Sequence, residues 1–98
     1  MMETPATDRI EFGTHIKFVP APPKPKTFVW WVVNKYDDDH LGWIGWFARW
    51  RKYSFYPKAD TVYEEICLRE IAEFCQRKTS EHRHAKVTES NDASTRSL

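Results

Sequence analysis

The chain has 98 residues, of which 41% are hydrophobic and 15% aromatic, so it has room for one small domain and not for a multidomain enzyme. Its 15 Lys and Arg nearly balance 14 Asp and Glu, and the formal charge of +1 excludes a protein that is basic or acidic throughout. The longest apolar run, residues 28–33, is far shorter than the ~20 residues of a membrane span, and the N-terminus lacks the pattern of a signal peptide. We therefore expect a soluble, cytoplasmic protein.

Composition predicts a single domain over residues 14–83. The polar segments 1–13 and 84–98 hold little that could be buried, and we expect both to be disordered. The four prolines of residues 20–26 restrict φ and remove backbone donors, which favours a stiff, extended connector. A Pro-x-x-Pro ligand motif is the less favoured interpretation of this connector.

Residues 27–56 form the predicted sheet. Aromatic and β-branched residues, interrupted by short turns, predict antiparallel strands near 27–36, 41–48 and 50–56. A further strand over residues 14–19 could pair at an edge of this sheet, since the alternation there stops at Pro20.

A helix is predicted over residues 60–80. Thr61 and Glu64 have the spacing of a capping box, and Pro57 precedes them as a chain breaker. One face of the helix is apolar and the opposite face carries alternating charges at a spacing of four residues. The apolar stripe comprises Tyr63, Cys67, Ile71 and Phe74, flanked by Leu68 and Cys75, and the charged ladder comprises Glu65, Arg69, Glu73 and Arg77.

The predicted fold class is therefore α+β, with an antiparallel three-stranded meander, and a fourth N-terminal strand as an option, packed on one C-terminal helix. Side chains alternate along a strand, and here both sets are apolar. One set comprises Trp30, Val32, Ile44, Trp46, Tyr53 and Phe55, and the opposite set comprises Trp31, Trp43, Phe47, Trp50, Lys52 and Tyr56.

A single helix can cover only one of these two faces. Either residues 10–19 fold back across the second face, with Phe12, Ile16 and Phe18 closing a small barrel or sandwich, or that face is open and binds a partner. Leaving several large aromatic side chains in water forgoes on the order of 10 kcal/mol of burial. We favour the open face as a binding surface.

Local charge differs along the chain. Residues 17–58 carry eight Lys or Arg against three Asp, a net charge of +5, whereas residues 59–83 have a net charge of −2. Basic residues among exposed aromatic rings suit single-stranded nucleic acid, and a sheet followed by a helix is also similar to the modules with which tyrosine recombinases read duplex DNA. The candidate partner-binding residues are Trp31, Lys35, Trp43, Phe47, Arg49, Trp50, Lys52 and Tyr56.

Aromatic residues and Arg are also typical of protein interfaces, so a protein partner, including a second copy of the chain, is the alternative. We expect no enzymatic activity, because the sequence has no phosphate-binding loop and no nucleophile motif. Residues 37–40 (Asp-Asp-Asp-His) are interpreted as a turn, and His82 and His84 as solvated residues at a frayed helix end. Cys67 and Cys75 are interpreted as packing thiols, and we expect neither a cofactor nor a metal; a metal-dependent hydrolase is the least favoured alternative.

One long pattern carries a resemblance. It runs Lys26-Thr27-x-x-Trp30-x-Val32-x-Asn34-Lys35, Leu41-Gly42-x-Ile44-x-Trp46, Trp50-Arg51-x-Tyr53-x-Phe55-x-Pro57, Thr61-Val62 and Cys67-Leu68-x-x-Ile71-x-x-Phe74. This pattern, over residues 26–83, resembles a family of small uncharacterised proteins of bacteriophage and bacterial genomes. The resemblance implies no activity for any residue, and its phage context favours an inhibitor or adaptor that binds a host protein. Trp31 and Trp43 occupy positions that the pattern leaves free.

Overall fold

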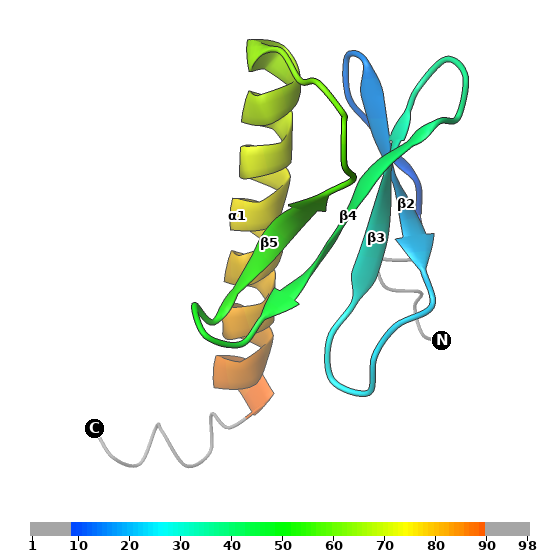
Figure 1. The fold of residues 1–98 in the computed structure, drawn as a ribbon. Coiled ribbons are helices and arrows are strands. Elements are labelled where there is room, and N and C mark those ends of the chain that lie inside the picture. Colours follow the sequence, from blue (N-terminus) through cyan, green and yellow to red (C-terminus); the bar gives the residue numbers. More distant parts are fainter. Residues whose placement is uncertain (1–8, 90–98) are drawn as a thin grey trace.

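The computed structural model describes residues 9–89 and shows an α+β fold of two layers (Figure 1). Five antiparallel strands form one open sheet in the order β1-β2-β3-β4-β5, so each strand pairs with its neighbour in the chain. One helix lies against one face of this sheet. The elements are β1 (Glu11–Phe12), β2 (Ile16–Ala21), β3 (Val29–Asn34), β4 (His40–Phe47), β5 (Lys52–Pro57) and α1 (Glu65–Glu89). No helix within residues 9–89 is long and apolar enough to cross a lipid bilayer.

The three predicted central strands are present as β3, β4 and β5, joined by tight turns. In the β3–β4 turn, the Asn34 side-chain oxygen accepts the backbone N–H of Tyr36 at 2.8 Å, and Asp38 adopts a left-handed φ of 62°. Asn and Asp tolerate these conformations because their side chains bond to the nearby backbone. The interpretation as a turn is therefore confirmed for residues 37–39, whereas His40 begins β4.

The N-terminal part of the prediction needs correction. Residues 1–8 of the segment predicted to be disordered lie outside the described residues, but Glu11 and Phe12 form β1 and pair with β2. β2 also runs beyond residue 19, through Pro20, which lies opposite Trp30. The strand tolerates Pro20 because β1 ends opposite Lys17 and Phe18, which leaves this outer edge of β2 without a pairing strand in the described residues.

The helix also differs from the prediction at both ends. It begins at Glu65 rather than at residue 60, because the Thr61 hydroxyl donates to the Lys58 carbonyl at 2.7 Å, and a Glu64 carboxylate oxygen accepts the backbone N–H of Ile66 instead. Glu64 is thus the N-terminal cap. The helix continues to residue 89, so residues 84–89 of the predicted disordered tail are helical, whereas residues 90–98 lie outside the described part.

Contacts with the sheet explain the extra length of α1. The Thr79 hydroxyl accepts the backbone N–H of Tyr53 at 2.9 Å, and the Arg83 guanidinium donates to the Arg51 carbonyl at 3.0 Å. His82 lies over the ring of Trp46 with 4.4 Å between the ring centroids. His82 is therefore half-buried against the sheet, and the interpretation of a solvated residue at a frayed end is wrong for it.

The core lies between α1 and the first of the two predicted faces. Phe74 stacks on Phe18, with ring centroids 4.0 Å apart, and meets Trp30 edge-on at 5.0 Å. Leu68, predicted to flank the buried stripe, is 50% exposed, because it lies about 100° around the helix from the buried Cys67. The buried core residues are Ile16, Phe18, Trp30, Val32, Ile44, Tyr53, Cys67, Ile71 and Phe74, with Trp46 and Phe55 half-buried beside them.

A buried cation was not predicted. Lys78 is only 2% exposed, and its ammonium group lies 3.2 Å from Glu11 and 3.3 Å from Glu81, above the ring of Trp30. Arg77 lies 2.9 Å from the other Glu11 oxygen. The two cations of α1 therefore fasten β1 to the helix through one carboxylate.

The predicted charge ladder on α1 forms only in part. Glu65 and Arg69 pair at 3.0 Å. Arg77, predicted to continue the ladder, binds Glu11 of β1 instead, because that carboxylate also bonds to the buried Lys78 and is itself only 26% exposed. Toward the C-terminal end of the predicted ladder, an ion pair between the helix and the sheet thus replaces a pair within the helix.

The carboxylate of Glu11 should make stability depend on acid. Burial alone would raise the pKa of Glu11, but hydrogen bonds from Arg77 and Lys78 outweigh it and hold the pKa below its ordinary value of 4.5. A carboxyl with a depressed folded pKa stabilises the fold above its unfolded pKa, and that contribution is lost as pH falls through the folded pKa. We expect Glu11→Gln to lower the free energy of unfolding at neutral pH by about 2 kcal/mol, the value of a hydrogen bond to a charged group.

Urea unfolding of wild type and Glu11→Gln at a series of pH values measures this difference. It should shrink as pH falls below 4.5. The control is Glu65→Gln, which removes an exposed partner of Arg69 and should change stability little at any pH. A difference for Glu11→Gln that stays constant from neutral to acid pH contradicts the assignment.

Candidate binding face

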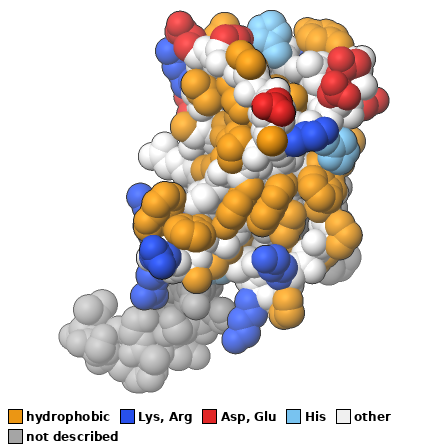
Figure 2. Space-filling view, in the orientation of Figure 1, with side chains coloured by type: hydrophobic (Ala, Val, Ile, Leu, Met, Phe, Trp, Pro, Cys, Tyr) orange, Lys and Arg blue, Asp and Glu red, His pale blue; other side chains and the backbone are white. Residues whose placement is uncertain are grey.

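The sheet face that points away from α1, which we call the outer face, carries a row of large side chains across four strands. Val19 of β2 lies opposite Trp31 of β3, Trp31 lies opposite Trp43 of β4, and Trp43 lies opposite Tyr56 of β5. Facing residues on neighbouring strands have Cβ atoms about 5 Å apart, so side chains in such a row are close enough to touch. Figure 2 shows the result as a band of hydrophobic side chains that crosses the molecule.

The rings of this face form an ordered set. Trp43 and Tyr56 stack almost parallel, with centroids 3.9 Å apart and planes inclined by 3°. Phe47 meets Tyr56 edge-on at 6.5 Å and Trp50 edge-on at 4.8 Å. At the other end of the row, Trp31 lies 5.2 Å from the His40 ring. The outer face therefore carries one connected cluster of four rings, Trp43, Tyr56, Phe47 and Trp50, beside the pair of Trp31 and His40.

Gly45 allows the indole of Trp43 to lie along its strand. A Cβ atom at Gly45 would lie 2.6 Å from a ring carbon of Trp43, which is closer than two carbon atoms can approach. Only glycine leaves this space, so the position of the Trp43 ring depends on the residue two places further along β4.

Several of these rings are accessible to a partner. Trp50 is 64% exposed and Trp31 is 37% exposed, whereas Trp43, Phe47 and Tyr56 are half-buried by their neighbours. A shallow hollow of about 260 Å³ opens beside the row. It is lined by Trp31, His40, Gly42, Trp43, Tyr56, Pro57 and Lys58.

The N-terminal segment does not cover this face, so the less favoured alternative, in which residues 10–19 fold back across it, is wrong. β1 and β2 extend the sheet sideways, and the side chains of Ile16 and Phe18 point into the core beneath α1. Phe12 lies opposite Lys17 on the outer side of this extension and is 64% exposed. Phe12 is thus an aromatic residue of the outer face and not part of a segment that closes it. Because side chains alternate along a strand, Phe12 lies on the side opposite to its neighbour Glu11, which faces α1.

The structure brings most of the predicted contact residues together. Trp31, Trp43, Phe47, Trp50 and Tyr56 lie on the outer face or at its border. Arg49 precedes Trp50 in the exposed β4–β5 turn, and Lys52 begins β5 opposite Phe47. Lys35 lies apart from the aromatic row: it follows the end of β3, and its ammonium group donates to the Gly13 carbonyl at 3.2 Å, so its part in binding stays a prediction.

The charges of the turns separate along the strand direction. In an antiparallel meander, every second turn lies at the same end of the sheet, so the β2–β3 connection and the β4–β5 turn share one end, and the β3–β4 turn lies at the other. In Figure 2, Asp and Glu lie above the hydrophobic band together with some Lys or Arg, whereas the charged side chains below the band are Lys and Arg. The basic end carries Lys24, Lys26, Arg49 and Arg51, and the acidic end carries Asp37, Asp38 and Asp39.

The cations at the two ends have different surroundings. At the acidic end, Lys17 pairs with Asp38 at 2.6 Å, and Lys35 is held by a backbone carbonyl. At the basic end, Lys24 lies 5.8 Å from the centroid of the Trp43 ring. Among residues 9–89, the side chains without an ion pair include Lys24, Lys26, Arg49, Arg51 and Lys52.

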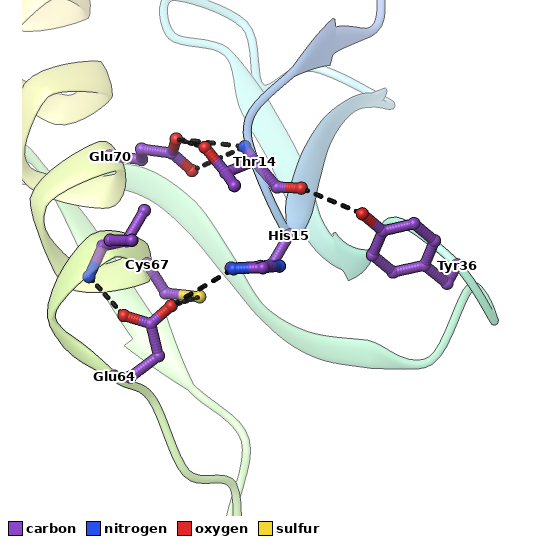
Figure 3. Close-up of polar contacts among 7 residues, drawn as sticks. Thr14, His15, Tyr36, Glu64, Cys67 and Glu70 are labelled. Carbon is purple, nitrogen blue, oxygen red and sulfur yellow. Dashed lines mark hydrogen bonds and ion pairs between the residues drawn. The ribbon is translucent and has the colours of Figure 1, made fainter.

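A separate polar cluster joins the β1–β2 connection to the start of α1 (Figure 3). The His15 ring lies 3.5 Å from the Glu64 carboxylate, and the Cys67 thiol lies 3.9 Å from the same oxygen. Beside them, the Thr14 hydroxyl donates to Glu70 at 2.8 Å. These contacts hold the N-terminal strands against α1.

The chemistry of the thiols does not favour nucleophilic catalysis. Burial, assisted by the negative charge of Glu64, raises the pKa of Cys67, and burial raises the pKa of Cys75 to about 11. Both thiols are therefore protonated at neutral pH, and a thiol is a much weaker nucleophile than a thiolate. In the part of the chain that the structure describes, no three His, Cys, Asp or Glu side chains gather as a metal site.

No protein-family model, curated protein or solved structure matches this chain. The resemblance to a family of phage and bacterial genomes therefore stays a prediction.

We predict that Gly45→Ala displaces the Trp43 ring and breaks its stack with Tyr56. Forcing an extra methyl group into this contact should lower the free energy of unfolding by about 1–3 kcal/mol. Chemical denaturation and near-ultraviolet circular dichroism measure the two effects. In a Trp43→Ala background the same substitution meets no indole and should cost about 0.5 kcal/mol or less; equal costs in both backgrounds would show that the ring does not depend on Gly45.

Proposed function

We propose that this protein is a non-enzymatic binding module that holds single-stranded nucleic acid on the outer face and its basic end. The observation that carries this proposal is that, in the described chain, cations without ion pairs lie next to the aromatic row at one end of the sheet. At the acidic end, Lys17 and Lys35 are engaged by Asp38 and by a backbone carbonyl, and Lys58 is a cation without an ion pair within residues 9–89. At the basic end, Lys24, Arg49 and Lys52 are together available to an anionic partner.

The exposed rings supply the second part of the recognition. Bases stack on aromatic side chains whatever their sequence, and each such contact contributes about 1–3 kcal/mol. Trp50 offers the most exposed indole of the surface, next to Arg49 in the same turn, and Trp31 offers a second ring. The stacked pair of Trp43 and Tyr56 lies between them.

Charge favours a single strand over a duplex. A sheet placed in the groove of a duplex has a phosphate backbone along each side, so one backbone would pass the basic end and the other would pass residues 37–39. Those residues are acidic, and within residues 9–89 Asp38 is the one among them that pairs with a cation, Lys17. A single strand needs one basic border, which the surface provides.

Replacing the exposed indole should weaken binding of a single strand. We expect Trp50→Ala to lower the affinity for a labelled single-stranded oligonucleotide by about 5-fold to about 150-fold, the range for one stacked base. Fluorescence anisotropy with single- and double-stranded oligonucleotides measures the change. Tyr36→Ala is the matched control, because Tyr36 is 74% exposed but lies in the acidic β3–β4 turn. Equal loss in both variants, or tighter binding of the duplex, contradicts the proposal.

The cations should appear in the salt dependence. Each phosphate contact on a single strand contributes about 0.7 to the slope of log affinity against log salt, so Arg49→Gln should reduce that slope by about this amount. Titrations between about 50 mM and about 200 mM salt give the slope. Arg69→Gln removes the same charge from the exposed face of α1, where Arg69 pairs with Glu65, and should leave the slope unchanged. Binding that does not respond to salt removes the nucleic-acid proposal.

A protein partner is the second candidate, and the closed stack of Trp43 on Tyr56 favours it. These rings already use one face of each other, so they present edges and an adjoining hollow rather than free stacking platforms. Aromatic side chains beside a hollow are typical of the centres of protein interfaces. Under this candidate Trp50→Ala weakens capture of a host protein or dissociates a homodimer, and oligonucleotide binding is absent; sedimentation of the purified chain distinguishes the homodimer.

A further inference from the structure

We propose that a second hollow, at the basic end of the sheet and on its helix side, binds a phosphorylated nucleotide. We call it the end hollow. Binding of the terminal phosphate of a nucleic-acid strand rests on the proposed function. Binding of a free nucleotide depends only on the residues that line the end hollow. The end hollow has a volume of about 380 Å³ and is lined by Lys26, Thr27, Trp46, Ala48, Arg51 and His82.

The fold brings these residues together from three separate parts of the chain. Lys26 and Thr27 lie in the connection between β2 and β3, and Arg51 lies in the turn between β4 and β5. Trp46 comes from β4, and His82 comes from the part of α1 that lies beyond its predicted end. The end hollow therefore exists only because the two basic turns share one end of the sheet and the helix reaches that end.

The polar groups of the end hollow are suited to an anion. Lys26 and Arg51 carry positive charge, the Trp46 indole N–H is a donor only, and the Thr27 hydroxyl can donate. No Asp or Glu is among its lining residues, and within the described chain neither Lys26 nor Arg51 makes an ion pair. Phosphate oxygens accept charge-assisted hydrogen bonds from such groups.

The walls are fixed before any ligand arrives. Arg51 has a left-handed φ of 57°, its backbone N–H donates to the Phe47 carbonyl at 2.8 Å, and its own carbonyl accepts from Arg83 at 3.0 Å. Trp46 is held edge-on against Tyr53, with ring centroids 5.2 Å apart. The backbone of Arg51 and the ring of Trp46 are thus held in place before a ligand binds, which reduces the freedom that is lost on binding.

Size and charge favour a terminal phosphate over an internal one. A phosphate monoester carries a charge of about −1.5 to −2 at neutral pH, which matches two cations, whereas an internal phosphodiester carries a single charge. Sites for small organic ligands begin at about 300 Å³, so a hollow of about 380 Å³ has room for a sugar beside the phosphate. The ligand class is thus a nucleotide with a phosphate monoester, either free or at the end of a strand.

The experiment compares single-stranded oligonucleotides of one sequence with and without a terminal phosphate, at the 5′ and at the 3′ end, together with thymidine 5′-monophosphate. We expect the terminal phosphate to raise the affinity of wild type about tenfold, the value of one charge-assisted hydrogen bond. Lys26→Gln and Arg51→Gln should each abolish this gain. Circular dichroism confirms that both variants fold.

Lys24→Gln is the matched control, because Lys24 lies in the same connection but faces the Trp43 ring and does not line the end hollow. It should weaken both forms of the oligonucleotide and keep the gain from the phosphate. A gain that survives in Lys26→Gln and Arg51→Gln, or no gain at either end in wild type together with no binding of the mononucleotide, overturns the end hollow.

The remaining outcomes separate the source of the ligand. Binding of thymidine 5′-monophosphate that is lost in Lys26→Gln, with no binding of any oligonucleotide, supports the end hollow as a site for free nucleotides and overturns the proposed function of the outer face. Binding of oligonucleotides that is lost in Trp50→Ala but is indifferent to a terminal phosphate supports the outer face and overturns the end hollow.

Discussion

The stack of Phe74 on Phe18, with Trp30 edge-on beside it, decides which face of the sheet the helix covers. Each buried ring removes about 200 Å² of apolar surface from water, worth about 5 kcal/mol. Because side chains alternate along β3, placing Trp30 beneath α1 forces Trp31 to the opposite side. The outer face is therefore a geometric consequence of the core. The sheet is aromatic on both faces, and the one helix of the described chain covers only the face that carries Trp30.

The two edges of this sheet are protected against pairing with a further strand, whereas its outer face is uncovered in the described chain. At the β5 edge, the backbone N–H of Tyr53 is taken by the Thr79 hydroxyl of α1, and Pro57 has no N–H to offer. At the opposite edge, β1 is only two residues long, and β2 carries Pro20. These features discourage pairing with a further strand, so a partner that approaches the sheet meets side chains of the outer face rather than free backbone.

The alternation of apolar residues was sufficient to predict both faces of the sheet, because period two is a local property of each strand. Contacts between segments that are distant in the sequence have no comparable local pattern from which they could be predicted. Lys78 has the composition of a surface residue, and nothing near it in the sequence indicates that Glu11 neutralises it in the core. The same reason explains the helix end: residues 80–89 are polar and look solvated, but His82 and Arg83 bind the sheet.

The candidate site divides in the same way. Rings within strands were placed correctly, since the alternation fixes their side of the sheet. The position of Lys35 apart from the aromatic row, one residue beyond β3, was not predicted, because a strand pattern does not predict where a turn directs its side chains. The end hollow was missed entirely: its cations stand 25 positions apart in the sequence, and only the extra turns of α1 give it a wall.

The directions of charge and of the aromatic row fix how a strand would lie under the proposed function. The charge difference runs along the strands, from the β2–β3 and β4–β5 turns to the β3–β4 turn, whereas the row from Trp31 to Tyr56 crosses the strands. A phosphate backbone is drawn to the basic border and away from residues 37–39. The nucleic-acid strand then runs parallel to the aromatic row, with its bases turned inward over the rings. One end of the nucleic-acid strand therefore lies at the β4–β5 turn, whose Arg51 lines the end hollow.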